Sequence, residues 1–67
     1  MGHYHFTVDS SGKIEVLGGT ALANDDAAIA FGKRVIQDFK RHSERYPGWA
    51  MLITEGDRTV GCIPFEP

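Results

Sequence analysis

The chain has 67 residues, of which 42% are hydrophobic and 24% are charged, a composition typical of one small globular domain over residues 1–67. Its one cysteine, Cys62, excludes an intramolecular disulfide, and no segment approaches the roughly 18 consecutive apolar residues of a membrane span. The formal net charge of -2 gives the whole molecule no attraction to nucleic acid or anionic lipid. We therefore expect a cytoplasmic protein that is complete as given.

The first part of the chain predicts a β-hairpin. Residues 3–9 alternate apolar and polar side chains, the period of a strand with one apolar face. Residues 9–12, with the sequence DSSG, favour a turn, and the alternation resumes over residues 13–17. We expect Gly18 and Gly19 to end this second strand.

A helix is predicted to begin at Asn24, a good N-cap, because the two aspartates that follow place negative charge where the helix dipole is positive. Gly32 lies within its apolar stripe, and we expect it to let a bulky side chain or a strand backbone approach closely. The helix should end near Arg45, because Pro47 disfavours a helical conformation at the preceding residue. The stripe itself recurs at helical spacing and consists of Ala28, Phe31, Val35, Ile36 and Phe39.

Two further strands complete the pattern. Residues 49–54 are largely apolar on both faces, which predicts a strand near the middle of the sheet. Residues 55–58 form a turn, and residues 59–65 form a last strand, which Pro64 places at an edge or leaving the sheet at that point. The fold class is therefore α+β, a two-layer ββαββ arrangement with one helix packed on a four-stranded, mainly antiparallel sheet. One plausible order along the sheet is second, first, third and fourth strand.

Several of these features resemble a family of short bacterial domains of unknown function, found mostly in alphaproteobacteria. The resemblance covers nearly the whole chain and implies a small cytosolic ββαββ unit, with no catalytic residue, cofactor or substrate to carry over. The chain departs from the family at Phe31 and Gly32, where a smaller alanine-rich pattern is usual. The residues that carry the resemblance are Tyr4 and Phe6, Gly19-Thr20 with Leu22, Ala27-Ala28, Trp49, Asp57-Arg58 with Val60, and Pro64-Phe65.

Two histidines are candidates for metal binding. His3 and His5 are two residues apart on one predicted strand, so both imidazoles project from the same face. A zinc or copper site needs further ligands, which Glu15 or His42 would have to supply. The simpler interpretation is a pair of half-exposed strand histidines, and we predict no cofactor.

Nucleophilic catalysis has little support in the sequence. Cys62 lies in an apolar strand, where a free cysteine is usually a small buried hydrophobe. Ser10 and Ser11 lie in a predicted turn without a strand-to-helix nucleophile elbow. The glycines before the helix lack the Lys-Ser or Lys-Thr pair of a phosphate-binding loop. We predict no catalytic residue and no enzyme activity.

Basic residues are concentrated on the predicted helix. Lys40 and Arg41 stand four and three residues before Glu44, so local ion pairs are expected to absorb part of the charge. A solvated face is the leading interpretation, and a regulatory nucleic-acid-binding module, resembling small bacterial antitoxins of the HicB type, is the alternative. The possible nucleic-acid face consists of Lys33, Arg34, Lys40, Arg41 and Arg45.

The second face of the sheet is the more promising surface. One helix covers only one side of a four-stranded sheet, whereas the later strands carry apolar residues on both sides. We expect Leu52, Ile63 and Phe65 to form an interaction surface, most simply in a symmetric homodimer. The sequence therefore predicts a non-catalytic, self-associating interaction module, with another protein as the other possible partner and no membrane contact.

Overall fold

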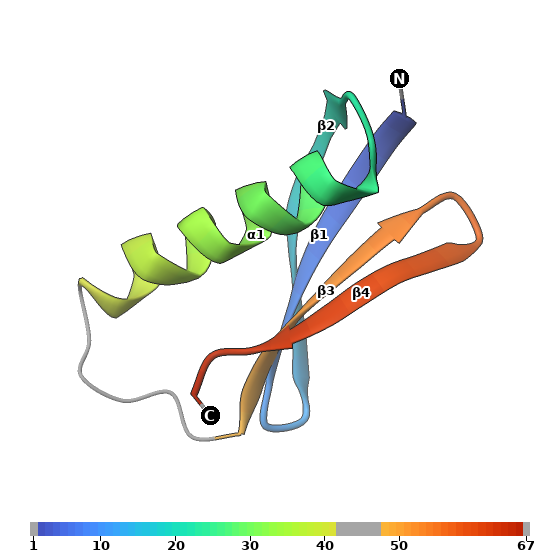
Figure 1. Ribbon diagram of the computed structural model, residues 1–67. Helices are drawn as coiled ribbons and strands as arrows, with labels where there is room; N and C mark the ends of the chain where they lie inside the picture. The colour runs from blue at the N-terminus through green and yellow to red at the C-terminus, as the bar shows by residue number, and fades with distance from the viewer. Residues whose placement is uncertain (1, 42–47, 67) are drawn as a thin grey trace.

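The computed structural model describes residues 2–41 and 48–66. One helix lies along one face of a single sheet (Figure 1), and all neighbouring strands pair antiparallel in the order β2-β1-β3-β4. The predicted α+β class, the ββαββ layout and the strand order are confirmed. The elements are β1 (Gly2–Ser10), β2 (Lys13–Leu22), α1 (Asp25–Lys40), β3 (Trp49–Glu55) and β4 (Arg58–Pro64). Within the described residues, no helix has both the length and the apolar character needed to cross a membrane.

The first hairpin is closed by a two-residue turn. Ser11 and Gly12 both have positive φ, 57° and 105°, the conformation in which the turn's twist matches that of the flanking strands. The Gly12 N–H donates to Oδ1 of Asp9 at 3.1 Å, and the Ser10 hydroxyl donates to the Lys13 carbonyl at 3.3 Å. The turn predicted at DSSG is thus confirmed.

Strand β2 is longer than predicted. It continues through Gly18 and Gly19 to Leu22, because a β-bulge shifts the register between Phe6 and Thr7 of β1 and leaves Leu17 as the extra residue. Gly18 follows the bulge with φ 125°, which a glycine adopts without strain. The expected strand end is therefore wrong, because these glycines bend the strand and do not terminate it.

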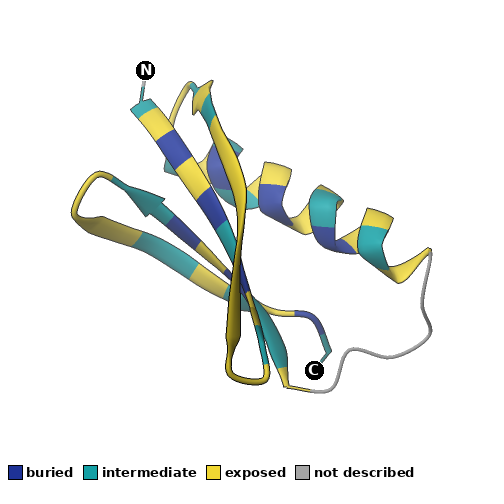
Figure 2. Cartoon of the chain, turned by 180° about the vertical axis from the view of Figure 1, so that it is seen from behind, coloured by how far each residue is buried: buried dark blue, intermediate teal, exposed yellow. Residues whose placement is uncertain are grey.

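The core lies between α1 and the facing side of the sheet (Figure 2). Strand β1 contributes alternate residues, as its period-two pattern predicted, and the dark blue positions of α1 face the same side. Phe31, expected in the buried stripe, is 40% exposed. It lies over the β2 flank, where the helix leaves the sheet uncovered. The buried residues of the core are Tyr4, Phe6, Val8, Ala28, Gly32, Ile36, Met51, Ile53 and Phe65.

Gly32 sets how closely α1 approaches the sheet. A Cβ atom at this position would lie 2.9 Å from Cδ1 of Ile53 and 3.3 Å from Sδ of Met51. Both side chains are fully buried in β3, so they have little room to move. The predicted role of Gly32 in close packing is confirmed.

The helix begins where predicted and ends earlier. Oδ1 of the N-cap Asn24 accepts a hydrogen bond from the Ala27 N–H at 2.9 Å. The last helical residue is Lys40 and the C-cap is Arg41. Arg45, the predicted end, lies outside the described residues.

A polar cluster joins the start of α1 to three strands. The Arg58 guanidinium donates to both carboxylate oxygens of Asp25, at 2.9 and 2.8 Å, and pairs with Glu55. The Tyr4 hydroxyl donates to Oδ1 of Asp25 at 2.9 Å. These hydrogen bonds, first from Arg58 and then from Tyr4, lower the pKa of Asp25 from 3.8 to about 2. Burial and the hydrogen bond to Asp25 raise the pKa of Tyr4 above 10.0.

Replacing Gly32→Leu should destabilise the fold, because the added side chain meets buried atoms of β3. We expect a loss of about 1–3 kcal/mol in the free energy of unfolding, measured by urea denaturation. The matched control is Ala30→Leu, at an exposed position of the same helix, which should stay within about 0.5 kcal/mol of wild type. Equal stability of Gly32→Leu and the control would contradict the close packing.

The Asp25–Arg58 pair should make stability depend on pH in the acid range. Because folding depresses the pKa of Asp25, its contribution is fully present above about pH 4 and is lost as the pH falls through about 2. Asp25→Asn should therefore lower the melting temperature at neutral pH and flatten its decline between pH 4 and 2. The control is Asp57→Asn in the adjacent turn, which should keep the wild-type profile. A wild-type pH profile in Asp25→Asn would contradict the assignment.

Candidate interaction surface on the open face of the sheet

The face of the sheet opposite α1, here called the open face, carries one charged side chain among the described residues. Because directly paired residues share a face, the register places the odd-numbered residues of β1 and their partners on this side. Asp9 is the charged residue. The residues of the open face are His3, His5, Thr7, Asp9, Ile14, Val16, Gly19, Ala21, Ala50, Leu52, Thr54, Thr59, Cys62 and Pro64.

An apolar row crosses the middle of the open face. Val16 pairs with Thr7, Thr7 with Leu52, and Leu52 with Cys62, so one residue from each strand lies at the same level. Val16 is 72% exposed and Leu52 is 37% exposed. Ile14, 66% exposed, lies beside Val16 on the same strand and face. Figure 2 shows β2 exposed along almost its whole length.

Two of the three residues predicted for this surface lie on the other side of the sheet. Leu52 is on the open face, but Ile63 pairs with Met51 and faces α1. Phe65 is 1% exposed, and its ring packs against those of Phe39 and Trp49, with centroids 5.7 and 5.8 Å apart. The prediction of an exposed surface at Ile63 and Phe65 is therefore wrong.

A β-bulge explains this error. If β3 and β4 paired without interruption outward from the turn at residues 56–57, Ile63 would pair with Ala50 and lie on the open face. The register instead shifts between Ile53 and Thr54, which leaves Val60 as an extra residue in β4. All later side chains of β4 therefore change face.

Cys62 is exposed on the open face, so its predicted burial is also wrong. Strand β3 separates β4 from the strand that carries His3 and His5, which places the thiol about 10 Å away from the histidines across the sheet. Of the two candidate serines, Ser10 donates its hydroxyl to the Lys13 carbonyl and Ser11 lies in the hairpin turn. None of the described histidines thus lies beside either group.

The two histidines contact each other. The rings of His3 and His5 have centroids 5.1 Å apart at 63°, an edge-to-face arrangement. They lean over Gly19, where a Cβ atom would lie 2.9 Å from Nδ1 of His5 and 3.1 Å from Nε2 of His3. Glu15 pairs with Val8 and faces the side of α1, so it cannot join them. His42 lies outside the described residues, within which no three metal-ligating side chains form a cluster.

The outer face of α1 is basic. Lys33, Arg34, Lys40 and Arg41 are exposed, and the two ion pairs found in the described part of the chain both belong to Arg58 instead. Arg45, and Glu44 with its expected ion pairs, lie outside the described residues.

Comparison of the chain with protein-family models, with curated proteins and with solved structures finds no match. What sets the open face apart is therefore the set of residues that the strand register places on it, of which one is charged. The polar set of β1 on this face, His3, His5, Thr7 and Asp9, could be assigned from the alternation in the sequence, but assigning residues of β2 and β4 to the same face required both bulges.

Zinc should not stabilise the protein through His3 and His5, because no other side chain of the described residues joins the two imidazoles to complete a stable site. We expect equimolar zinc to leave the melting temperature of wild type unchanged, as in a His3→Ala, His5→Ala variant. A zinc-dependent rise in wild type that the double variant lacks would show a metal site.

Proposed function

We propose that the protein is a non-catalytic interaction module that self-associates as a symmetric homodimer, with the open faces of two sheets packed together. The observation that carries the proposal is that this face has exposed apolar side chains and almost no charged ones. A sheet face that stays in water normally carries polar residues opposite the core side. Here Val16, Ile14 and Leu52 occupy such positions.

The charges of the chain are concentrated elsewhere. The sequence has seven basic and nine acidic residues. Among the described residues, the register places only one of them, Asp9, on the open face. The central level of the face, Val16, Thr7, Leu52 and Cys62, is uncharged across all four strands. Packing two copies would therefore bury apolar atoms without burying an unpaired charge near the centre of the interface.

The open face has the size of an interface between two copies. Four strands at a spacing of about 4.8 Å, with roughly seven residues at about 3.3 Å each, give a footprint on the order of 400 Å². Because side chains project from the sheet, its accessible area exceeds this footprint, and a standard interface buries roughly 800 Å² of accessible area on each partner. Two such sheets pack about 10 Å apart, as in a β-sandwich.

Self-association also suits a chain of this length. A domain of about 60 residues buries only about 60% of its unfolded surface, and oligomerisation is a common way to add buried area. The uncovered side of this sheet carries three of the exposed large apolar side chains among the described residues, Ile14, Val16 and Leu52. A homodimer would turn a two-layer domain into a four-layer one.

Regulatory nucleic-acid binding by the outer face of α1 is the competing proposal. It is supported by the four exposed cations, Lys33, Arg34, Lys40 and Arg41, which form no ion pair with other described residues. Asp38 lies on the same helix near Arg34 and Arg41 and reduces the local potential. The net charge of -2 also gives no long-range attraction to a polyanion. Self-association is therefore the better-supported function.

Sedimentation equilibrium tests the homodimer directly. We expect wild type to dimerise at micromolar concentrations, and Leu52→Lys or Val16→Lys to weaken the dimer by at least about 2 kcal/mol, roughly thirtyfold in Kd, since each buries a charge in the interface. Ala30→Lys, at an exposed position on α1, is the matched control and should dimerise like wild type. A wild-type protein that remains monomeric at high micromolar concentration would refute self-association.

A further inference from the structure

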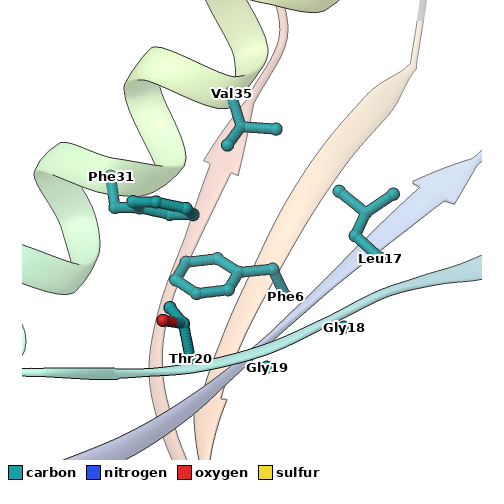
Figure 3. Close-up of a pocket in the computed structure, with 7 residues that line it drawn as sticks. All are labelled: Phe6, Leu17, Gly18, Gly19, Thr20, Phe31 and Val35. Carbon is teal, nitrogen blue, oxygen red and sulfur yellow. The ribbon is translucent and has the colours of Figure 1, made fainter.

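A groove of about 260 Å³ lies between α1 and β2, on the side of the sheet opposite the open face. Figure 3 shows the ring of Phe31 lying directly over the ring of Phe6, with Val35 and Leu17 beside them. The ring centroids of Phe6 and Phe31 are 5.0 Å apart at 46°. The groove lies where α1, which packs most closely on β3 and β4, stands away from the middle of β2.

The lining of the groove is uncharged and mostly apolar, with Thr20 as its polar side chain. Phe6 is buried at its floor, whereas Phe31 and Leu17 are each 40% exposed at its rim. Gly18 pairs with Phe6 and faces the groove, and a Cβ atom there would have nothing within 4 Å. A cavity of about 150 Å³ holds a benzene molecule, so this groove has room for one large apolar side chain.

The groove runs beside an unpaired strand edge. β2 pairs with β1 on one side and has no partner strand on the other among the described residues, and eight of its ten residues are exposed. The outward N–H and C=O groups of such a strand form a template for another extended chain. A backbone template next to an apolar groove is the arrangement by which strand-adding domains bind peptides, with affinity from the main chain and selectivity from a pocket.

We propose that β2 and α1 form a peptide-binding site, in which an extended segment of a partner protein adds to the edge of β2 and inserts one large apolar side chain between Phe31, Val35 and Gly18. A second copy of β2 fits this site poorly. Its own groove-side residues include Lys13, Glu15 and Gly18, and Leu17 already lines the groove of its own chain. β4, the other edge strand of a second copy, carries a bulge at Val60 and ends in Pro64, features that oppose pairing along an edge. The occupant is therefore a segment of another protein with alternating side chains and an aromatic or aliphatic residue facing α1.

The proposal is tested with a synthetic peptide, acetylated and amidated Lys-Thr-Thr-Phe-Thr-Thr-Lys carrying a fluorescent label, by fluorescence anisotropy. Two altered peptides test the apolar groove and the backbone edge of β2 separately. One replaces Phe by Ser, and the other carries N-methyl groups on alternate Thr amides, which removes hydrogen-bond donors along one strand edge. We expect each altered peptide to bind at least tenfold more weakly than the parent.

Variants of the protein locate the site. Val35→Trp fills the groove and Phe31→Ala removes one wall at a half-exposed position, and each should weaken parent-peptide binding at least tenfold while circular dichroism shows the fold retained. The matched control is Val16→Trp, on the opposite face of β2, which should bind like wild type. Leu52→Lys should also bind like wild type, so that failure of the peptide site is distinguishable from failure of the homodimer.

Three results would overturn the proposal. Equal binding of the parent and N-methylated peptides would show that the groove takes a side chain or a small apolar ligand without strand addition. Equal binding of the parent and Ser peptides, or full binding by both groove variants, would show that the groove is not used.

Discussion

The close packing of α1 against one face of the sheet is the constraint on which the other features depend. Gly32 allows contact with Ile53 and Met51 at distances that a side chain would prevent, and the Asp25–Arg58 pair holds the start of the helix over β4. A helix about 10 Å across covers only part of a four-stranded sheet. Its closest packing is on β3 and β4, which leaves two surfaces with little cover, the open face and the flank of β2.

Two β-bulges determine what these surfaces present. In β2 the bulge at Leu17 brings that side chain and Gly18 to the groove beside Phe31. In β4 the bulge at Val60 turns Cys62 outward and Ile63 inward. A bulge changes the face on which the following side chains lie without interrupting the sheet. Each one therefore moves an apolar residue between core and surface, and few backbone hydrogen bonds between the strands are lost.

The two proposed sites lie on opposite sides of the sheet and use different parts of β2. Self-association would use the side chains of Val16 and Ile14, whereas peptide addition would use the outer backbone edge and the helix-facing side. A dimer formed through the open faces would therefore carry two free grooves. The basic residues of α1 are exposed and are not among the residues that line the groove or the open face.

Local patterns in the sequence determined the helix and the strands. The pairing of distant segments decided which side chains lie on each face of the sheet. The alternation in residues 3–9, the N-cap Asn24 and the DSSG turn act over a few residues, so the ββαββ layout was predictable. Bulges arise only when two strands pair, and for that reason Ile63, Phe65 and Cys62 were assigned to the wrong side. The cluster of Tyr4, Asp25 and Arg58 joins residues 21 and 33 positions apart, a proximity that no local pattern encodes.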